Sequence, residues 1–138
     1  MKLYLDLVKI QIIKMEAEYP VEIFNKLEDT DEVTIRVLYN AQFDRKKIQP
    51  VKGFQFPVHA KLELFIEDHD FKLVSYIAEC QFLVKDETVD TESGELLAKE
   101  IAFLSYPYAR EVVAEALIRL GMPTALPYSP PLPTLQIG

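Results

Sequence analysis

The residues with the greatest chemical potential in this sequence are one cysteine and two histidines. Cys80 lies in the apolar run FKLVSYIAECQFLV at 71–84, without a basic neighbour that would lower the pKa of its thiol. His59 lies on the polar side of an alternating run and His69 in a polar turn, and no further ligands are evident that would complete a metal site with them. We interpret Cys80 as a buried structural thiol and the histidines as solvated or packing side chains.

Two other kinds of site are not supported by the sequence. The segment DTESGE at 90–95 is faintly similar to a calcium-binding loop, but its sixth position is not glycine and Ile101 stands where the bidentate glutamate belongs. The chain has only four glycines, and they are too far apart to form a phosphate-binding loop. We therefore expect no metal, no cofactor and no enzymatic activity.

Composition and charge indicate one globular unit. The chain has 138 residues, of which 49% are hydrophobic, which is enough for a modest core in a single domain, 1–138. Its 15 basic and 22 acidic residues give a formal net charge of −7, which argues against a nucleic-acid-binding surface. The sequence shows neither a signal peptide nor an apolar run long enough to span a bilayer, so we expect a cytoplasmic protein that does not insert into membranes.

Three alternating runs predict antiparallel strands. Apolar residues take every second position at 32–43 and at 54–68, whereas the run at 71–84 has apolar side chains on both faces. The polar connection EDHD at 67–70 is short enough for a hairpin, so these strands should form a meander. Pro57 has no amide donor, so it should lie at a sheet edge or before the pairing begins.

The first run, at 4–19, alternates but changes phase. Its apolar residues change from odd-numbered to even-numbered positions between Leu7 and Val8, and back to odd-numbered positions between Ile12 and Ile13. Each slip would turn the apolar side chains to the other face of the sheet unless an extra residue is inserted. We therefore predict a long strand with at least one β-bulge.

The C-terminal third predicts helices followed by an extended tail. A short helix is expected at 96–104 and a second at 107–120, which has Pro107 at its first position and a Gly-x-Pro stop. Arg110 would then meet the positive end of the helix dipole, so we expect an acidic partner elsewhere. Five of the nine prolines lie at 123–138, which predicts an extended segment that neither a sheet nor a helix would use.

The loop at 19–31 carries more apolar side chains than a surface loop needs. We expect a groove for other polypeptide chains to be lined by apolar side chains of this loop and of the helix entrance: Tyr19, Ile23, Phe24, Leu27, Leu104 and Tyr106. The alternatives for this apolar surface are ordinary core and a subunit interface.

Three stretches resemble the SecB family of protein-export chaperones. The run FLSYPYAREVVAEALIRLGMPTALPYSP at 103–130 is similar to that family's Phe-Pro-Tyr-Ala-Arg-Glu helix opening, its Gly-x-Pro helix end and the following Leu-x-Pro segment. YIAECQFLV at 76–84 is similar to the family's Phe-Leu-Cys-Glu-Val strand, and IIKMEAEYP at 12–20 to the end of its first strand. The resemblance covers most of the chain, and the middle strands agree in pattern.

The resemblance implies an α+β fold, a SecB-like four-stranded antiparallel sheet with helices packed on one face, assembled as a homotetramer (a dimer of dimers) or at least as a dimer. It implies a chaperone that holds unfolded or precursor polypeptides translocation-competent for Sec-dependent export and passes them to the SecA motor. The family's SecA-docking residues fall on Glu18, Ile77 and Glu79, whereas a further family acid falls at Lys14.

Other functions remain open at this point. A solitary SecB-like chaperone dedicated to an antitoxin or another client, without handover to SecA, belongs to the same family. An oligomeric scaffold without clients, or an enzyme whose pocket the sequence does not reveal, would come from a different class. An aggregation-suppression assay together with a solution mass would separate these alternatives.

Overall fold

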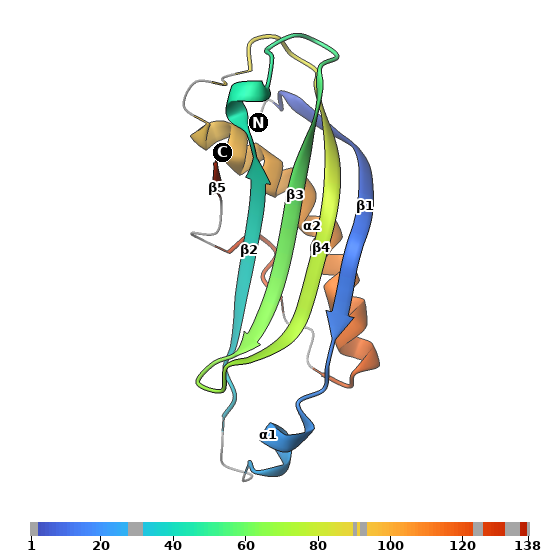
Figure 1. The fold of residues 1–138 in the computed structure, drawn as a ribbon, viewed down its shortest axis with the longest axis vertical. Coiled ribbons are helices and arrows are strands. Elements are labelled where there is room, and N and C mark those ends of the chain that lie inside the picture. The colour runs from blue at the N-terminus through green and yellow to red at the C-terminus, as the bar shows by residue number, and fades with distance from the viewer. Residues whose placement is uncertain are drawn as a thin grey trace.

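The protein is an antiparallel sheet with one long helix packed across a single face (Figure 1). The computed structural model describes residues 3–27, 32–89, 91, 94–122, 126–131 and 136–137. The elements are β1 (Leu5–Ala17), α1 (Val21–Asn25), β2 (Ile35–Phe43), a 3-10 turn (Arg45–Lys47), β3 (Gln55–Ile66), β4 (Phe71–Val84), α2 (Glu95–Arg119) and β5 (Gln136–Ile137). The strand order is β1-β4-β3-β2-β5, so the expected four-stranded antiparallel sheet with helical cover on one face is confirmed, and a short fifth strand is added.

The meander of β2, β3 and β4 follows from the alternation in the sequence. Ala41 pairs with Ala60, which pairs in turn with Ala78, so small side chains lie side by side across three strands beneath the helix. The last β2–β3 pair is Gln42 with His59, and Pro57 lies beyond it. Pro57 pairs with Gln81 of β4 on its other side, so this end of β3 is a sheet edge toward β2, which is the first of the two expected positions, and β2 needs no hydrogen bond from the proline.

The long strand β1 contains two irregularities, as its phase changes predicted. Its register against β4 shifts between Leu7 and Lys9 and again between Ile12 and Lys14. The inserted residues, Val8 and Ile13, are exposed, whereas β1 residues before and after them keep an apolar face toward the helix. The bulges thus absorb both slips and leave apolar side chains at the free edge of the sheet.

The core lies between the sheet and α2. Its largest fully buried side chains come from both layers, and among them are Tyr39, Tyr76, Phe82, Ile101, Tyr106 and Leu117. Tyr39 and Ser105 share a hydrogen bond between their side-chain hydroxyls, and the Ser105 hydroxyl also donates to the carbonyl of Ile101 at 2.7 Å. This buried link joins β2 to the middle of the helix.

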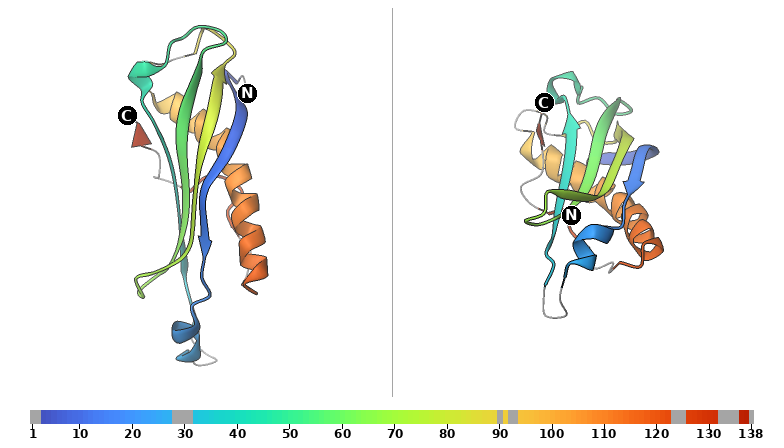
Figure 2. Two further views of the ribbon diagram at one scale, coloured as in Figure 1. Left: turned by 45° about the vertical axis from the view of Figure 1, so that its right-hand side comes forward. Right: turned by 60° about the horizontal axis from the view of Figure 1, so that its bottom comes forward.

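The two helices expected at 96–104 and 107–120 are one helix. α2 is continuous over 25 residues, with Pro107 inside it, although Pro107 has no amide to donate to the carbonyl of residue 103. Buried side chains on both sides of the proline, such as Ala102, Tyr106 and Ala109, hold the two halves against the same sheet. Figure 2 shows that the halves run in different directions, as a proline kink produces.

The C-terminal segment also departs from expectation. β5 pairs in parallel with β2, at Gln42 with Gln136 and Phe43 with Ile137, so the sheet does use the end of the predicted tail. The last proline of the chain is Pro133, which leaves the amides of the final residues able to pair. Residues 123–125, 132–135 and 138 of that tail lie outside the described part.

Arg110 binds main-chain carbonyl oxygens and not the acidic side chain that was expected. Because α2 begins at Glu95, Arg110 is far from the positive end of the helix dipole. Its guanidinium donates to the carbonyl oxygens of Leu126 and Pro127 in the C-terminal segment, where an acid had been expected. In the described part of the chain, no helix is both long and apolar enough to cross a membrane.

Candidate functional site

An apolar groove runs between the second half of β1 and the C-terminal half of α2. Its volume is about 450 Å³. Apolar side chains of both elements line it, with an ion pair at the rim: Ile12, Met15, Ala17, Val112, Glu115, Ala116, Arg119 and Leu120. A groove of this size and lining suits the apolar side chains of an extended polypeptide.

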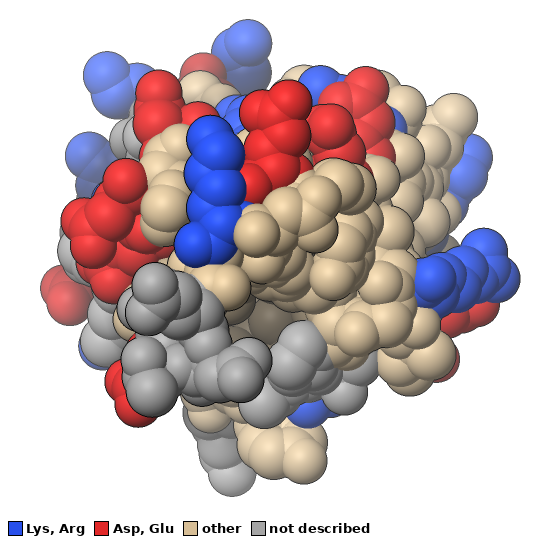
Figure 3. Space-filling model, turned by 90° about the horizontal axis from the view of Figure 1, so that it is seen from below, with Lys and Arg blue, Asp and Glu red and all other residues tan. Residues whose placement is uncertain are grey.

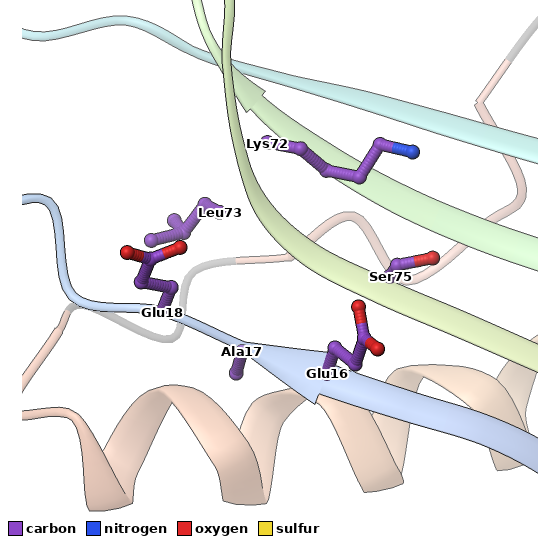
Figure 4. Close-up of a pocket in the computed structure, with 6 residues that line it drawn as sticks. All are labelled: Glu16, Ala17, Glu18, Lys72, Leu73 and Ser75. Carbon is purple, nitrogen blue, oxygen red and sulfur yellow. The ribbon is translucent and has the colours of Figure 1, made fainter.

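The local sequence explains why these side chains meet. After the bulge at Ile13, Met15 pairs with Tyr76 and Ala17 with Val74, which are buried beneath the helix. Figure 4 shows the side chain of Ala17 pointing toward α2, opposite to that of Glu16. On α2, Val112, Ala116 and Leu120 are four residues apart, so they lie on one side of the helix, facing β1. They are half-buried, and they therefore offer contact surface to another chain.

The rim of the groove carries a neutralised charge pair. Arg119 donates to the Glu115 carboxylate at 2.8 Å across one helical turn. Both side chains are exposed, so this pair contributes little to stability. It leaves the groove without net charge and without a nucleophile, and the groove is therefore suited to binding rather than to covalent chemistry.

An aromatic pair follows the end of β1 in the chain. Tyr19 follows Ala17 by two residues, and its ring meets that of Phe24 edge to face with centroids 5.3 Å apart. Tyr19 and Val21 are exposed, whereas Ile23, Phe24 and Leu27 are half-buried. Figure 1 shows α1 at the lower end of the sheet, where β1 ends. The loop residues expected to line a groove therefore lie together at this end.

The two helix residues expected in the same groove lie elsewhere. Leu104 is half-buried and Tyr106 is fully buried, and both belong to the middle of α2, away from α1 (Figure 1). The Tyr106 ring packs edge to face on Tyr39 with centroids 5.2 Å apart. Burial raises the pKa of Tyr106, and its hydroxyl donates to the carbonyl of Pro127 at 2.6 Å. The six candidate residues are therefore split between two places in this chain.

The opposite face of the sheet has no helical cover among the described residues. We call it the polar face because of its charged side chains, although the half-buried Ile77 and Leu83 also lie on it. Glu63 forms ion pairs with Lys61 at 3.3 Å and with Lys72 at 2.6 Å, and Arg36 stacks over the Phe65 ring. The face that Figure 1 turns toward the viewer lies along the upper edge of Figure 3, where charged side chains gather. The uncharged surface seen from below lies beneath that edge.

The residues expected to dock SecA lie on this polar face. Ile77 pairs with Lys14, and Glu79 pairs with Gln11 on β1. Glu18 is exposed and lines a hollow of about 340 Å³ with Glu16, Ser75 and other residues near the end of β1 (Figure 4). Lys14 is bound to Glu16 at 3.4 Å, so a basic side chain lies within the acidic row. The structure thus brings the three candidate residues to one face, with Lys14 beside them.

Cys80, His59 and His69, the candidate reactive side chains, do not form a common site. Cys80 is 1% exposed, and burial, with a smaller effect of the Glu79 charge, raises the pKa of its thiol to about 11. Its interpretation as a buried thiol is confirmed. His59 and His69 are exposed and well separated in the chain. No group of three metal-ligating side chains lies close together in the described ranges.

Sequence reasoning missed the groove beside β1. Met15 belonged to a run whose phase changes, and Val112, Ala116 and Leu120 lay within the helix expected at 107–120 but were not predicted to line a groove. Two signals pointed to it. One is the second phase slip at Ile13. The other is that Val112, Ala116 and Leu120 form a row of their own with a spacing of four residues, beside the fully buried row of Ala109, Val113 and Leu117.

Comparisons with known proteins identify the fold. No protein-family model and no curated protein sequence matches the chain. The solved structure of the Mycobacterium tuberculosis SecB-like chaperone Rv1957, in complex with a ChAD peptide from the Rv1956 HigA1 antitoxin, is similar with a TM-score of 0.54 at 18% identity, covering 95% of this chain and 88% of that one. A Streptococcus agalactiae protein of unknown function superposes with a TM-score of 0.44 at 14% identity, covering 86% and 92%. The likeness to the mycobacterial structure shows that the chain has the α+β fold of a SecB-like chaperone.

Proposed function

We propose that this protein is a molecular chaperone of the SecB-like type, which binds unfolded or precursor polypeptides and prevents their aggregation. The observation that carries the proposal is the presence of two apolar features near the end of β1, the groove beside that strand and the Tyr19–Phe24 pair that follows it in the chain. The groove has no net charge and no nucleophile, and the two rings and Met15 can adapt to many client side chains. The shared fold with a chaperone supports the same proposal.

The expected affinity of one such surface is modest. If a client segment buries about 600 Å² of apolar area, the gross gain is on the order of 15 kcal/mol at roughly 25 cal/mol per Å². Ordering the client and losing its free motion cost most of that gain. Several equivalent surfaces on an oligomer would raise the overall affinity through avidity.

We propose that the oligomer is a homotetramer, with a dimer as the smallest functional form. The free edge of β1 carries exposed apolar side chains at Val8, Ile12 and Ile13, and Ile118 is exposed on α2. An exposed apolar sheet edge is an association site unless another chain covers it.

Aggregation suppression tests the function. The double variant Phe24→Ser/Leu27→Ser and the groove variant Met15→Glu should each lower the affinity for an unfolded client at least several-fold. Val51→Ser is the matched control, because Val51 is also exposed and apolar but lies in the turn before β3, remote from α1. Circular dichroism confirms that each variant is folded.

Two results would contradict the proposal. If the parent protein does not slow the aggregation of any unfolded client, the apolar surface serves only assembly, and the protein is a scaffold. If the parent holds clients and both site variants hold them equally well, clients bind at another surface.

We propose two alternative roles for a chaperone of this type, Sec-dependent export and protection of a dedicated client. Sec-dependent export would use Glu18, Ile77 and Glu79 on the polar face, where electrostatic attraction to a basic SecA segment weakens as salt rises. Lys14 lies beside Ile77 and weakens that attraction. The alternative is a solitary chaperone dedicated to an antitoxin or another client, and it agrees with the antitoxin peptide bound to the mycobacterial chaperone.

Charge reversal separates these destinations. Glu79→Lys should abolish SecA binding, if SecA binds, and should leave client holding intact, because the client surface lies elsewhere. SecA binding that survives this substitution would rule out the polar face as its docking surface. A parent protein that holds clients but binds no SecA would be the dedicated chaperone.

A further inference from the structure

A short C-terminal segment is bound against α2 like a peptide ligand. The Tyr106 hydroxyl donates to the Pro127 carbonyl at 2.6 Å, and the Arg110 Nε donates to the same oxygen at 3.2 Å. The Arg110 Nη2 donates to the carbonyl of Leu126 at 3.3 Å. Tyr106 and Arg110 are one turn apart on the helix, so their donors converge on two consecutive main-chain carbonyls.

Side chains of the segment complete the arrangement. Leu126 is buried within the core, whereas Tyr128 is 86% exposed. The centroid of the Tyr128 ring lies 4.3 Å from Arg110 Cζ, so the ring packs over the guanidinium. The Leu126 side chain is thus buried in the core, and the Pro127 carbonyl accepts two hydrogen bonds. The Tyr128 ring packs over the Arg110 guanidinium.

These contacts select an extended chain by its backbone. Arginine offers only donors, so Arg110 can bind any chain that presents carbonyl oxygens. Pro127 has no amide hydrogen, so the segment presents its carbonyl here without an amide donor that needs a partner. Apart from the leucine-sized socket, the site makes few demands on sequence, which is the chemistry needed to bind an unfolded polypeptide.

We propose that the Tyr106–Arg110 side of α2 is a second polypeptide-binding site, and that the chain's own segment 126–128 fills it as an internal competitor of clients. This inference rests on the proposed client-binding function. The ligand is an extended segment in which a leucine or similar apolar residue precedes a carbonyl-presenting residue such as proline. The site lies on the side of α2 away from the groove, because Val112, Ala116 and Leu120 face β1.

The anchor of the segment is small enough for a client to displace it. The contacts described for residues 126–128 are three hydrogen bonds, one buried leucine and one ring over a cation. Among the other described residues of the tail, Pro131 makes a further contact and β5 adds two register pairs with β2. The covalent tether gives the segment a high effective concentration, so a client competes only when it binds at several places at once.

The first test measures binding in trans with a fluorescein-labelled peptide of sequence LPYSPP, which is that of residues 126–131. Leu126→Ser should loosen the internal segment, so the peptide should bind this variant at least tenfold more tightly than the parent. Adding Arg110→Gln should abolish that gain. Adding Lys99→Gln should preserve it, because Lys99 is an exposed cation of the same helix that pairs only weakly with Glu95.

The second test leaves the core unchanged. The chain has no tryptophan, so Tyr128→Trp places a single reporter at an exposed position. Excess unlabelled LPYSPP, and separately a tryptophan-free unfolded client, should displace the segment and lower the anisotropy of indole fluorescence. The peptide SPYSPP, which lacks the leucine, should have a much weaker effect.

The outcomes separate this inference from the proposed function. The second site is overturned if LPYSPP neither binds Leu126→Ser nor lowers the indole anisotropy, or if Arg110→Gln does not change its binding. Internal competition is overturned if the client is held while the anisotropy stays constant. If LPYSPP binds but no client is held by any form of the protein, the peptide site stands and the chaperone function fails.

Discussion

Cys80 shows how strongly burial controls a reactive group at the scale of one residue. The thiol has its usual pKa of 9.0 in the unfolded chain and a pKa raised to about 11 in the folded protein, with burial as the main cause. Between these values the unfolded chain has released the proton while the folded protein retains it. The free energy of unfolding therefore falls as the pH rises above about 9.

Denaturant unfolding at several pH values checks this prediction. We expect a loss approaching about 1 kcal/mol per pH unit between pH 9 and 10, and a flatter dependence in Cys80→Ala. The same burial should keep the native thiol unreactive toward maleimide at pH 8, whereas the denatured chain should react fully. Rapid labelling of the native protein would show that Cys80 is accessible.

Two adjacent residues of α2 test its packing at the scale of the element. Leu117 is 2% exposed and faces the sheet, whereas Ile118 is 65% exposed. Leu117→Ala should lower the free energy of unfolding by about 2–5 kcal/mol, because it leaves a cavity in the core. Ile118→Ala should change it by less than about 0.5 kcal/mol in the monomeric unit. Equal effects of the two substitutions in urea titrations would contradict the placement of α2.

The elements that alternation specifies were predictable, and those that depend on distant contacts were not. The run at 71–84 became β4 with the same bounds, and the phase changes near Val8 and Ile13 became bulges, because both depend on local periodicity. Pro107 misled the prediction because its local preference for a helix start is outweighed by buried neighbours on both sides. The pairing of β5 with β2 joins residues almost a hundred positions apart, and no local pattern encodes it.

The site follows the same division. The loop aromatics Tyr19 and Phe24 stood out because apolar rings are unusual in a loop, and they do pack on one another. Tyr106 was expected in the same groove from its position at the helix entrance, but the helix does not begin there. The role of Arg110 depends on a segment 16 and 17 residues away, so only the fold could show it.

At the scale of the whole molecule, the apolar edge predicts assembly. Ile13 is 57% exposed at the second bulge of β1, where no described element covers it. The parent protein should have the mass of a tetramer, or of a dimer, by light scattering at micromolar concentration. Ile13→Lys should reduce that mass without unfolding the subunit, because a charge at the edge opposes association.

Val51→Lys is the matched control for this substitution. Val51 has a similar exposure of 55% but lies in a turn away from the sheet edge, so the variant should assemble as the parent does. A parent protein that is monomeric at this concentration would contradict the assembly. An Ile13→Lys variant with an unchanged mass would place the interface on another surface.

The two bulges of β1 limit how far a strand of another chain can extend the sheet at this edge. Between them, only the four residues Lys9–Ile12 keep an unbroken register with β4. A straight strand from a partly folded chain could extend the ladder over that short run and would lose its match at either end. Growth of a cross-β fibre needs a long, flat and repeatable template, and this edge does not provide one. In a subunit that is not yet assembled, this apolar edge is therefore a poor template for the growth of fibrils from other chains.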